Sequence, residues 1–137
     1  MITEDYVSFE TAELLKEKGF PQDPRICNTA YTLKGSLSNN AKSFIYDYVE
    51  LNKLGIKPNY YSIAPTLQMA MKWLREEKNI ILDICPNLDL DCMCIGTYCR
   101  IVYKDNERVT LDADYDDFAT YEEAVEAAIK YCLENLI

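Results

Sequence analysis

Apolar residues at helical spacing predict a first helix close to the start of the chain. Phe9, Ala12 and Leu15 would lie on one face of that helix. Ser8 precedes them and can cap the first turn, because its hydroxyl can accept a hydrogen bond from a free backbone amide. Gly19 can adopt the left-handed conformation that ends a helix, so the helix is expected to stop there.

Two further helices are predicted by the same spacing. Pro65 suits a helix start, and Asn79 can end the segment that follows. The apolar stripe of this second helix consists of Leu67, Ala70, Met71 and Leu74.

Thr120 and Glu123 form a capping box that predicts the start of the last helix. The stripe expected to be buried there consists of Tyr121, Ala124, Val125, Ala128, Cys132 and Leu136.

Strand-forming residues gather between turn residues in four places. The Asp105-Asn106 pair tolerates the positive φ of a tight hairpin and is expected to join the strand of residues 94–104 to that of residues 107–111. Pro86 is expected to stop the strand of residues 80–85. The residues 89–91 are expected to form a loop, and residues 41–54 fit either a helix or a strand, with helix favoured. The predicted strands are residues 25–33, 80–85, 94–104 and 107–111.

This order of elements predicts an α+β fold. We expect two layers, an antiparallel sheet of about four strands with three or four helices packed on one face. A length of 137 residues with 49% apolar residues is enough for one continuous core, and no linker or repeat interrupts the pattern. Residues 1–137 are therefore expected to form a single domain.

Charge and composition narrow the possible functions. The chain has no histidine, which excludes Ser-His-Asp, Cys-His and His-zinc chemistry. The net charge of −9 opposes direct binding to nucleic acid, whose affinity comes from Lys and Arg at phosphates. An acidic N-terminus without an apolar segment predicts a cytoplasmic protein, and no apolar run is long enough to cross a membrane.

Four of the six cysteines lie close together in the sequence. In a cytoplasmic protein we expect thiols instead of disulfides. A four-thiolate zinc site is the alternative, but the spacing contains no C-x-x-C pair, and a regular strand would point Cys94 and Cys99 to opposite faces. A bulge near Gly96 would restore a common face. The four residues are Cys85, Cys92, Cys94 and Cys99.

The acidic region of residues 105–126 contains a candidate calcium loop. Asp112, Asp114 and Asp116 alternate as oxygen ligands do, and Glu123 stands at the twelfth position of the loop. Asp117 occupies the sixth position, where glycine is usual, and Glu123 also belongs to the capping box. The alternatives are carboxylates that favour a helix N-terminus, or an acidic surface that mimics DNA.

Tyrosines crowd the middle of the chain and are candidates for contact with a partner. Rigid amphipathic rings are frequent anchors at interfaces, although they also occupy sheet edges. The candidates are Tyr46, Tyr48, Tyr60 and Tyr61.

The segment of residues 64–76, APTLQMAMKWLRE, resembles a stretch that recurs in short proteins of gut Bacteroidales and their prophage-like elements. Residues 13–20 and 120–124 also look like the ends of that family's proteins. The family has no assigned activity, so the resemblance implies a shared fold and carries over no catalytic residue.

Taken together, these features predict a protein that is not an enzyme, uses no cofactor and binds another protein, as an accessory protein of a mobile element or phage would. The calcium-binding domain, the acidic DNA mimic and an enzyme that uses only carboxylates remain as alternatives. The last would require carboxyl groups whose pKa values are shifted strongly by burial.

Overall fold

The computed structural model has an α+β architecture, as the sequence predicts. It describes residues 4–32, 35–39, 53–55, 61–111 and 117–137. Within these ranges there are three helices and two antiparallel sheets of three strands each. The chain divides into two compact units, Met1–Thr66 and Leu67–Ile137. The expectation that the whole chain is one domain stays a prediction.

The first unit contains α1, Phe9–Glu17, and the capping prediction is confirmed there. The Ser8 Oγ accepts a hydrogen bond from the Thr11 amide at 3.2 Å. At the other end Gly19 has φ +101°, and the Phe20 amide donates to the Leu15 carbonyl at 2.8 Å. The helix buries Ala12 and Leu15 completely, so this face of α1 supplies part of the core of the first unit.

The sheet of the first unit has the order β2-β1-β3, with β1 at Ala30–Thr32, β2 at Leu37–Ser38 and β3 at Tyr61–Ile63. The strand expected over residues 25–33 begins later than predicted. Asp23 is the cause, because its carboxylate accepts the Arg25 amide and its carbonyl accepts the Ile26 amide. These bonds hold the segment in a turn.

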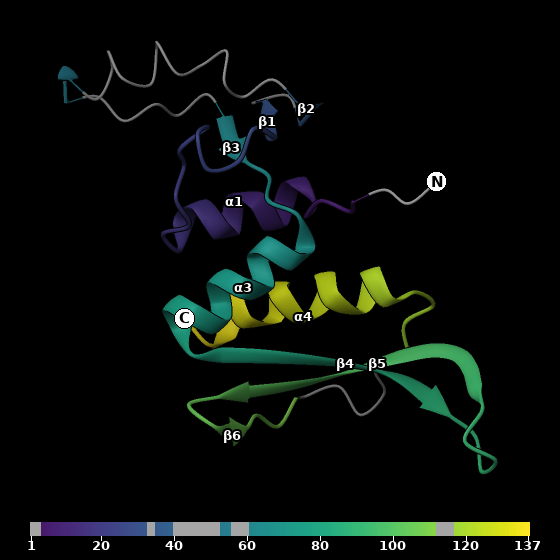
Figure 1. Ribbon diagram of the computed structural model, residues 1–137. Helices are drawn as coiled ribbons and strands as arrows, with labels where there is room; N and C mark the ends of the chain where they lie inside the picture. Colours follow the sequence, from purple (N-terminus) through teal and green to yellow (C-terminus); the bar gives the residue numbers. More distant parts are fainter. Residues whose placement is uncertain (1–3, 33–34, 40–52, 56–60, 112–116) are drawn as a thin grey trace. The chain divides into compact units, whose positions relative to one another are not determined.

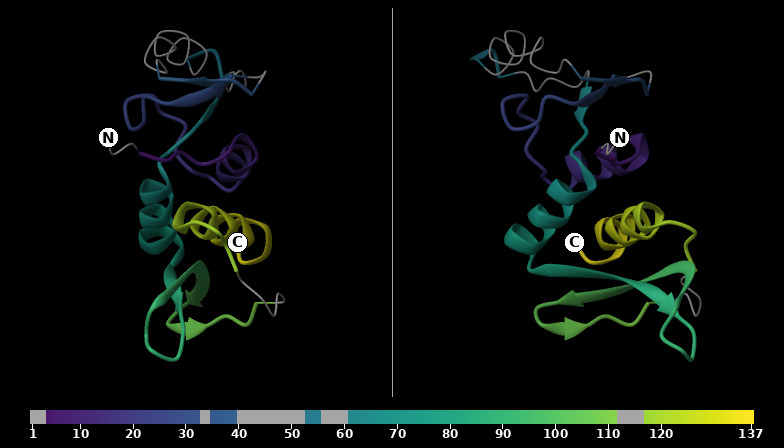
Figure 2. Two further views of the ribbon diagram at one scale, coloured as in Figure 1. Left: turned by 90° about the vertical axis from the view of Figure 1, so that its right-hand side faces the viewer. Right: turned by 45° about the vertical axis from the view of Figure 1, so that its right-hand side comes forward.

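The second unit places two helices on one face of its sheet (Figure 1). The order of its strands is β4-β5-β6, and both neighbouring pairs are antiparallel. Figure 2 shows α3 and α4 on the same side of β4 and β5 from two further directions. The elements are α3 (Leu67–Lys78), β4 (Ile80–Leu88), β5 (Cys94–Lys104), β6 (Glu107–Arg108) and α4 (Tyr121–Asn135).

The predicted ends of these elements are largely confirmed. Asn79 has φ +53° and separates α3 from β4, and Asp105 and Asn106 have φ +53° and +67° in the hairpin between β5 and β6. The Thr120 Oγ1 accepts the Glu123 amide at 3.1 Å and caps α4. The residues that form the core of this unit include Leu67, Ala70, Leu74, Ile80, Val102, Val125, Ala128, Ile129, Cys132 and Leu133.

Pro86 does not end its strand, which is a correction to the prediction. It lies inside β4 opposite Tyr98. Tyr98 uses both its backbone amide and its carbonyl in bonds to Phe118, at 2.9 and 3.0 Å, so its polar groups point away from β4. No bond from position 86 to β5 is therefore lost when proline lacks an amide hydrogen.

The sheet prediction is confirmed only in its class. The described strands form two sheets instead of one sheet of about four strands, because β1 pairs with β2 and β3 while β4 pairs with β5. The strand predicted for residues 107–111 ends at Arg108. The helix favoured for residues 41–54 lies almost entirely outside the described residues.

None of the described helices combines the length and the apolar character that crossing a membrane would require.

Candidate binding site at the hairpin between β4 and β5

The hairpin that joins β4 to β5 extends past the part of the sheet that the helices cover. Its regular pairing ends at Pro86, and the register shifts before Leu88 pairs with Cys94. Gly96 has φ +82° within this irregular stretch, where the sequence allowed for a bulge. We call residues 88–93 the hairpin tip.

Asp89 organises the backbone of the hairpin tip. Its carbonyl accepts the Cys92 amide at 3.1 Å, and its own amide donates to the Met93 carbonyl at 2.9 Å. Its Oδ1 also accepts the amides of Asp91 and Met93, at 2.9 and 3.0 Å. Cys92 has φ +60°, which completes a turn of the kind that ends in a left-handed residue. The tip therefore has a defined backbone conformation.

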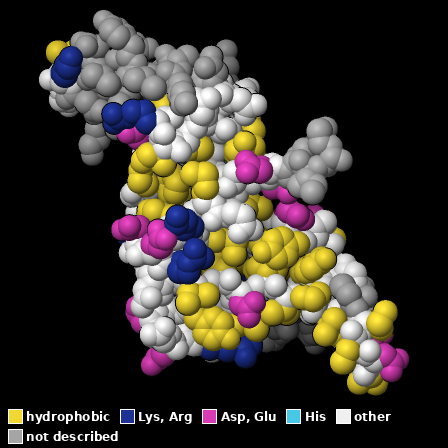
Figure 3. Space-filling view, viewed as in Figure 1, with side chains coloured by type: hydrophobic (Ala, Val, Ile, Leu, Met, Phe, Trp, Pro, Cys, Tyr) yellow, Lys and Arg dark blue, Asp and Glu magenta, His cyan; other side chains and the backbone are white. Residues whose placement is uncertain are grey.

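Three large apolar side chains project from this ordered backbone. Leu90 is 103% exposed, Met93 is 64% exposed and Leu88 is 53% exposed. Figure 3 shows hydrophobic side chains gathered at the tip of this hairpin, with acidic atoms among them. Single exposed leucines are common on protein surfaces, but several on one short, ordered turn form a local apolar patch of the kind found at interaction sites.

The electrostatic surroundings of the hairpin tip are negative. No lysine or arginine occurs between Lys78 and Arg100, whereas Asp83, Asp89 and Asp91 lie in that interval. All three of these carboxylates are exposed. A surface of this kind attracts a positively charged partner and is repelled by anionic lipid or nucleic acid.

Polar contacts hold the base of the hairpin. The Asn87 Nδ2 donates to the Thr97 Oγ1 at 2.9 Å and to the Asp117 Oδ1 at 2.8 Å, which ties β4 to β5 and to the segment before α4. The Arg100 Nη1 donates to the Ala127 carbonyl at 2.8 Å. These bonds fix the direction in which the hairpin leaves the sheet.

The Arg100 guanidinium also packs between two aromatic rings on the helix-covered face. Its central carbon lies 5.6 Å from the Phe118 ring centroid and 5.4 Å from that of Tyr131. Cys132 is completely buried nearby, and its burial raises the pKa of its thiol to about 12. This cluster joins β5 to α4 through packing and a hydrogen bond.

The predicted calcium ligands are only partly within the described residues. Asp112, Asp114 and Asp116 lie outside them. Glu123 is exposed in the first turn of α4, where its amide is bonded to Thr120 as the capping motif predicts. The calcium site therefore stays a prediction.

The proposed zinc ligands are separated along the hairpin. Cys85 and Cys99 are opposite each other in β4 and β5, whereas Cys92 lies in the tip. Cys94 begins β5, and its side chain lies outside the described set. Over the part of the chain that the structure describes, no group of three or more His, Cys, Asp or Glu side chains is placed to hold a metal ion.

The candidate tyrosines also fall mostly outside the described residues. This applies to Tyr46, Tyr48 and Tyr60, while Tyr61 lies in β3, where its backbone pairs with Thr32. Of the acidic region, Asp105, Glu107 and Asp117 are exposed.

The apolar residues of the hairpin tip were not among the sequence candidates. The available signal was the Leu-Asp-Leu-Asp run inside a predicted loop, since leucine is unusual in an exposed turn.

Comparisons of this chain with protein-family models, with curated proteins and with solved structures gave no match. The resemblance to the Bacteroidales proteins therefore stays a prediction.

Proposed function

We propose that this protein is a binding protein without catalytic activity, and that its hairpin tip inserts into an apolar pocket of a partner protein. The observation that carries the proposal is the full exposure of Leu90 on a turn whose backbone is fixed by hydrogen bonds to Asp89. A fixed turn loses little conformational freedom on binding, which favours affinity.

The apolar side chains of the tip would supply most of the binding energy. Burying a fully exposed leucine or methionine side chain contributes about 1.5 to 3 kcal/mol. Leu90 and Met93 are the most exposed of the three apolar residues, so they are expected to be the main anchors. Leu88 lies nearer the sheet and would contact the rim of the pocket.

The charge around the tip indicates the chemistry of the partner. Asp89 and Asp91 are exposed beside the apolar anchors, and the whole chain carries a net charge of −9. A pocket flanked by lysine or arginine would complement this surface and would accelerate association. The partner would thus be a basic protein, of the kind that itself binds nucleic acid or another acidic protein.

The chemistry of the thiols supports a role without catalysis. A nucleophilic cysteine needs a lowered pKa. Burial raises the pKa of Cys27 and of Cys132, and burial followed by the charge of Asp83 raises the pKa of Cys85. We further propose, on the composition discussed above, that the protein works in the cytoplasm and requires no cofactor.

Co-purification with paired variants tests the proposal. The wild-type chain, Leu90→Ser and Met93→Ser would be used to recover proteins from the source cell. Leu54→Ser is the matched control, because Leu54 is also an exposed leucine, at 72%, but lies in the other unit. We expect a basic protein to be recovered with the wild type and the control, and to be lost with the two tip variants and at high salt.

Three results would contradict this proposal. Equal recovery with all variants would remove the hairpin tip from the interface. Self-association of the pure protein that Leu90→Ser abolishes, measured by sedimentation equilibrium, would show that a second copy covers the tip. Tip-dependent binding to phosphatidylcholine or phosphatidylserine vesicles would identify a lipid surface instead of a protein.

A further inference from the structure

Two cysteines face each other across the strands that carry the hairpin. Cys85 of β4 and Cys99 of β5 are direct partners in the antiparallel register, and both are free thiols. The neighbouring residue Tyr98 directs its amide and carbonyl toward Phe118. Because backbone groups alternate along a strand, those of Cys99 point toward β4, and the two cysteines occupy a hydrogen-bonded pair.

The Cα spacing of such a pair lies within the range of a disulfide, although its Cβ spacing does not. The Cα atoms of a hydrogen-bonded antiparallel pair are about 5.5 Å apart, and bridged cysteines have Cα separations of about 4.4 to 6.8 Å. The Cβ atoms of such a pair are about 5 to 5.5 Å apart, whereas those of bridged cysteines are about 3.5 to 4.5 Å apart. The two thiols already interact, since Cys99 is one of the groups that influence the pKa of Cys85. A bond between them therefore keeps the register of β4 and β5 but draws the two Cβ atoms closer together, which makes it a strained and easily reduced disulfide.

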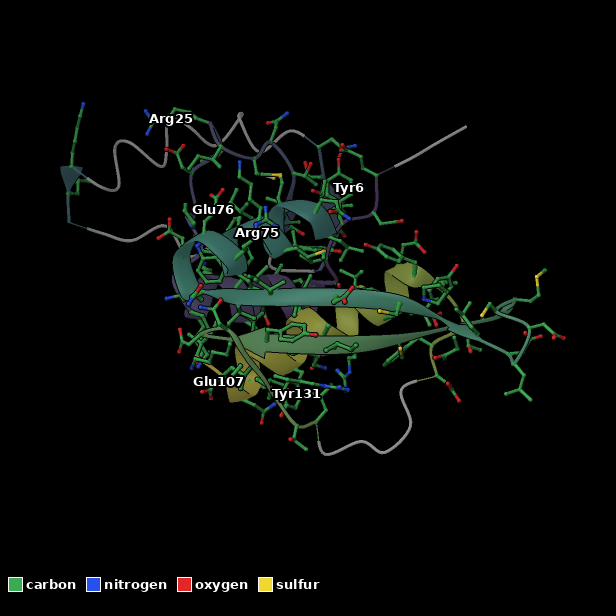
Figure 4. All side chains as sticks on the ribbon, turned by 60° about the horizontal axis from the view of Figure 1, so that its bottom comes forward. Tyr6, Arg25, Arg75, Glu76, Glu107 and Tyr131 are labelled. Atoms are coloured by element: carbon green, nitrogen blue, oxygen red, sulfur yellow. The ribbon has the colours of Figure 1, made fainter. Side chains whose placement is uncertain are left out.

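The pair lies on the face of the sheet that the helices do not cover. Residues Ile80 and Leu82 of β4 are buried beneath the helices, so the alternate residues point to the opposite face. On that face Ile81 is 42% exposed, and Asp83 is also exposed. Figure 4 looks at β4 and β5 with α4 behind them, toward this open face. Small molecules in solution can thus reach the two half-buried thiols.

The other described cysteines differ from this pair. Cys27 and Cys132 are buried, and the Cys27 Sγ donates to the carbonyls of Ala64 and Thr29, at 3.4 and 3.6 Å. Cys92 is exposed in the hairpin tip. Within the described residues, Cys85 and Cys99 are the only two cysteines placed opposite each other by strand pairing.

We propose that Cys85 and Cys99 form a redox modification site, which a low-molecular-weight disulfide such as oxidised glutathione converts to a cross-strand disulfide. One protein thiolate attacks a sulfur of oxidised glutathione, forms a mixed disulfide and releases one glutathione thiolate. The second protein thiol loses its proton to solvent and attacks the protein sulfur of the mixed disulfide. The second glutathione leaves, so two protein thiols are oxidised and one glutathione disulfide is reduced.

The surroundings of Cys85 make the first step of this reaction slow. Burial is the main cause of its raised pKa, and the Asp83 carboxylate adds to it. Only a small fraction of Cys85 is therefore ionised at neutral pH, which slows its attack on any disulfide. The adjacent Cys99 thiol offers an intramolecular partner at a high effective concentration, so the second step is favoured once the first has occurred.

Thiol mapping of the full-length chain tests this site. Reduced protein would be equilibrated in buffers with an increasing ratio of oxidised to reduced glutathione. The remaining thiols would then be alkylated, and the peptides would be identified by mass spectrometry. We expect two of the six thiols to be lost and one peptide that joins Cys85 to Cys99. Reduction with excess glutathione should restore both thiols.

Single variants distinguish the pair from its neighbours. In Cys85→Ser a mixed disulfide with glutathione should persist on Cys99, whereas Cys92→Ser should form the joined peptide as the wild type does. The proposal is overturned if Cys85 and Cys99 stay alkylatable under these conditions, if Cys92 pairs with Cys94 instead, or if the products are disulfides between two chains. Because the wild-type chain carries the main test, a variant that fails to fold leaves that test intact.

Discussion

The two ends of the β4–β5 hairpin share strands but differ in how their apolar residues are used. At the base, Ile80 and Val102 are completely buried between the sheet and the helices. At the tip, Leu90 and Met93 are exposed, although hydrogen bonds to Asp89 hold the backbone there. The burial at the base accounts for stability, and the exposure at the tip is what the proposed role in recognition requires.

The first prediction concerns the stability that the buried residues at the base of the hairpin provide. Ile80→Ala removes a completely buried side chain and leaves a cavity, so the free energy of unfolding should fall by about 2 to 5 kcal/mol. Urea denaturation followed by tryptophan fluorescence would measure it, because Trp73 lies in α3 of the same unit. Ile81→Ala is the matched control on the open face and should cost much less. Equal losses from both variants would mean that the open face is covered in solution.

The next prediction concerns the buried thiol of Cys132 in α4 and the dependence of stability on pH. Burial raises the pKa of the Cys132 thiol from 9.0 to about 12. The unfolded chain releases this proton near pH 9 while the folded chain keeps it, so the stability should fall as the pH rises from 9 toward 12. The expected loss is about 1 kcal/mol per pH unit within that window. Denaturation at pH 8 and pH 10 would reveal it, and Cys132→Ala should make the dependence smaller, leaving the part that Cys27 and Cys85 contribute. If the free energy of unfolding depended on pH equally in the wild type and in the variant, the burial of this thiol would be contradicted.

The order of the tip should depend on one carboxylate. Asp89→Ala removes the Oδ1 that accepts the amides of Asp91 and Met93, and it should cost about 1 kcal/mol. Hydrogen exchange at those two amides should quicken, while exchange in β4 near Ile80 stays unchanged. Asp89→Asn keeps an oxygen acceptor and should retain most of the protection. Slow exchange in Asp89→Ala would show that the turn does not depend on this side chain.

Local signals in the sequence predicted the three described helices and the hairpin between β5 and β6, but not the strands β2 and β3. Ser8, Gly19, Thr120 and the Asp105-Asn106 pair act through bonds within a few residues, and each behaves as its chemistry requires. The division into two sheets was not predictable in this way, because it depends on which distant strands pair. Alternation patterns show which face of a strand is apolar, but they do not identify its neighbour.

The candidate site also depends on contacts between residues that are distant in the sequence, which local signals do not predict. Pro86 was expected to end a strand because proline lacks an amide hydrogen, but Tyr98 bonds to Phe118 and removes that requirement. The pairing of Cys85 with Cys99 likewise depends on a register that spacing alone does not fix. The loop over residues 89–91 was predicted from its aspartates, whereas the exposure of Leu90 within it became evident only from the structure.

The smallest expected effect on stability separates the tip from the base most directly. Leu90→Ser should change the free energy of unfolding by less than about 0.5 kcal/mol, because the side chain is 103% exposed and loses no contact. The proposed partner should nevertheless be lost with this same variant. A large loss of stability would show that Leu90 packs against the protein itself, and the apolar tip would then belong to the core. Unchanged stability together with lost binding is the combination that a dedicated recognition residue requires.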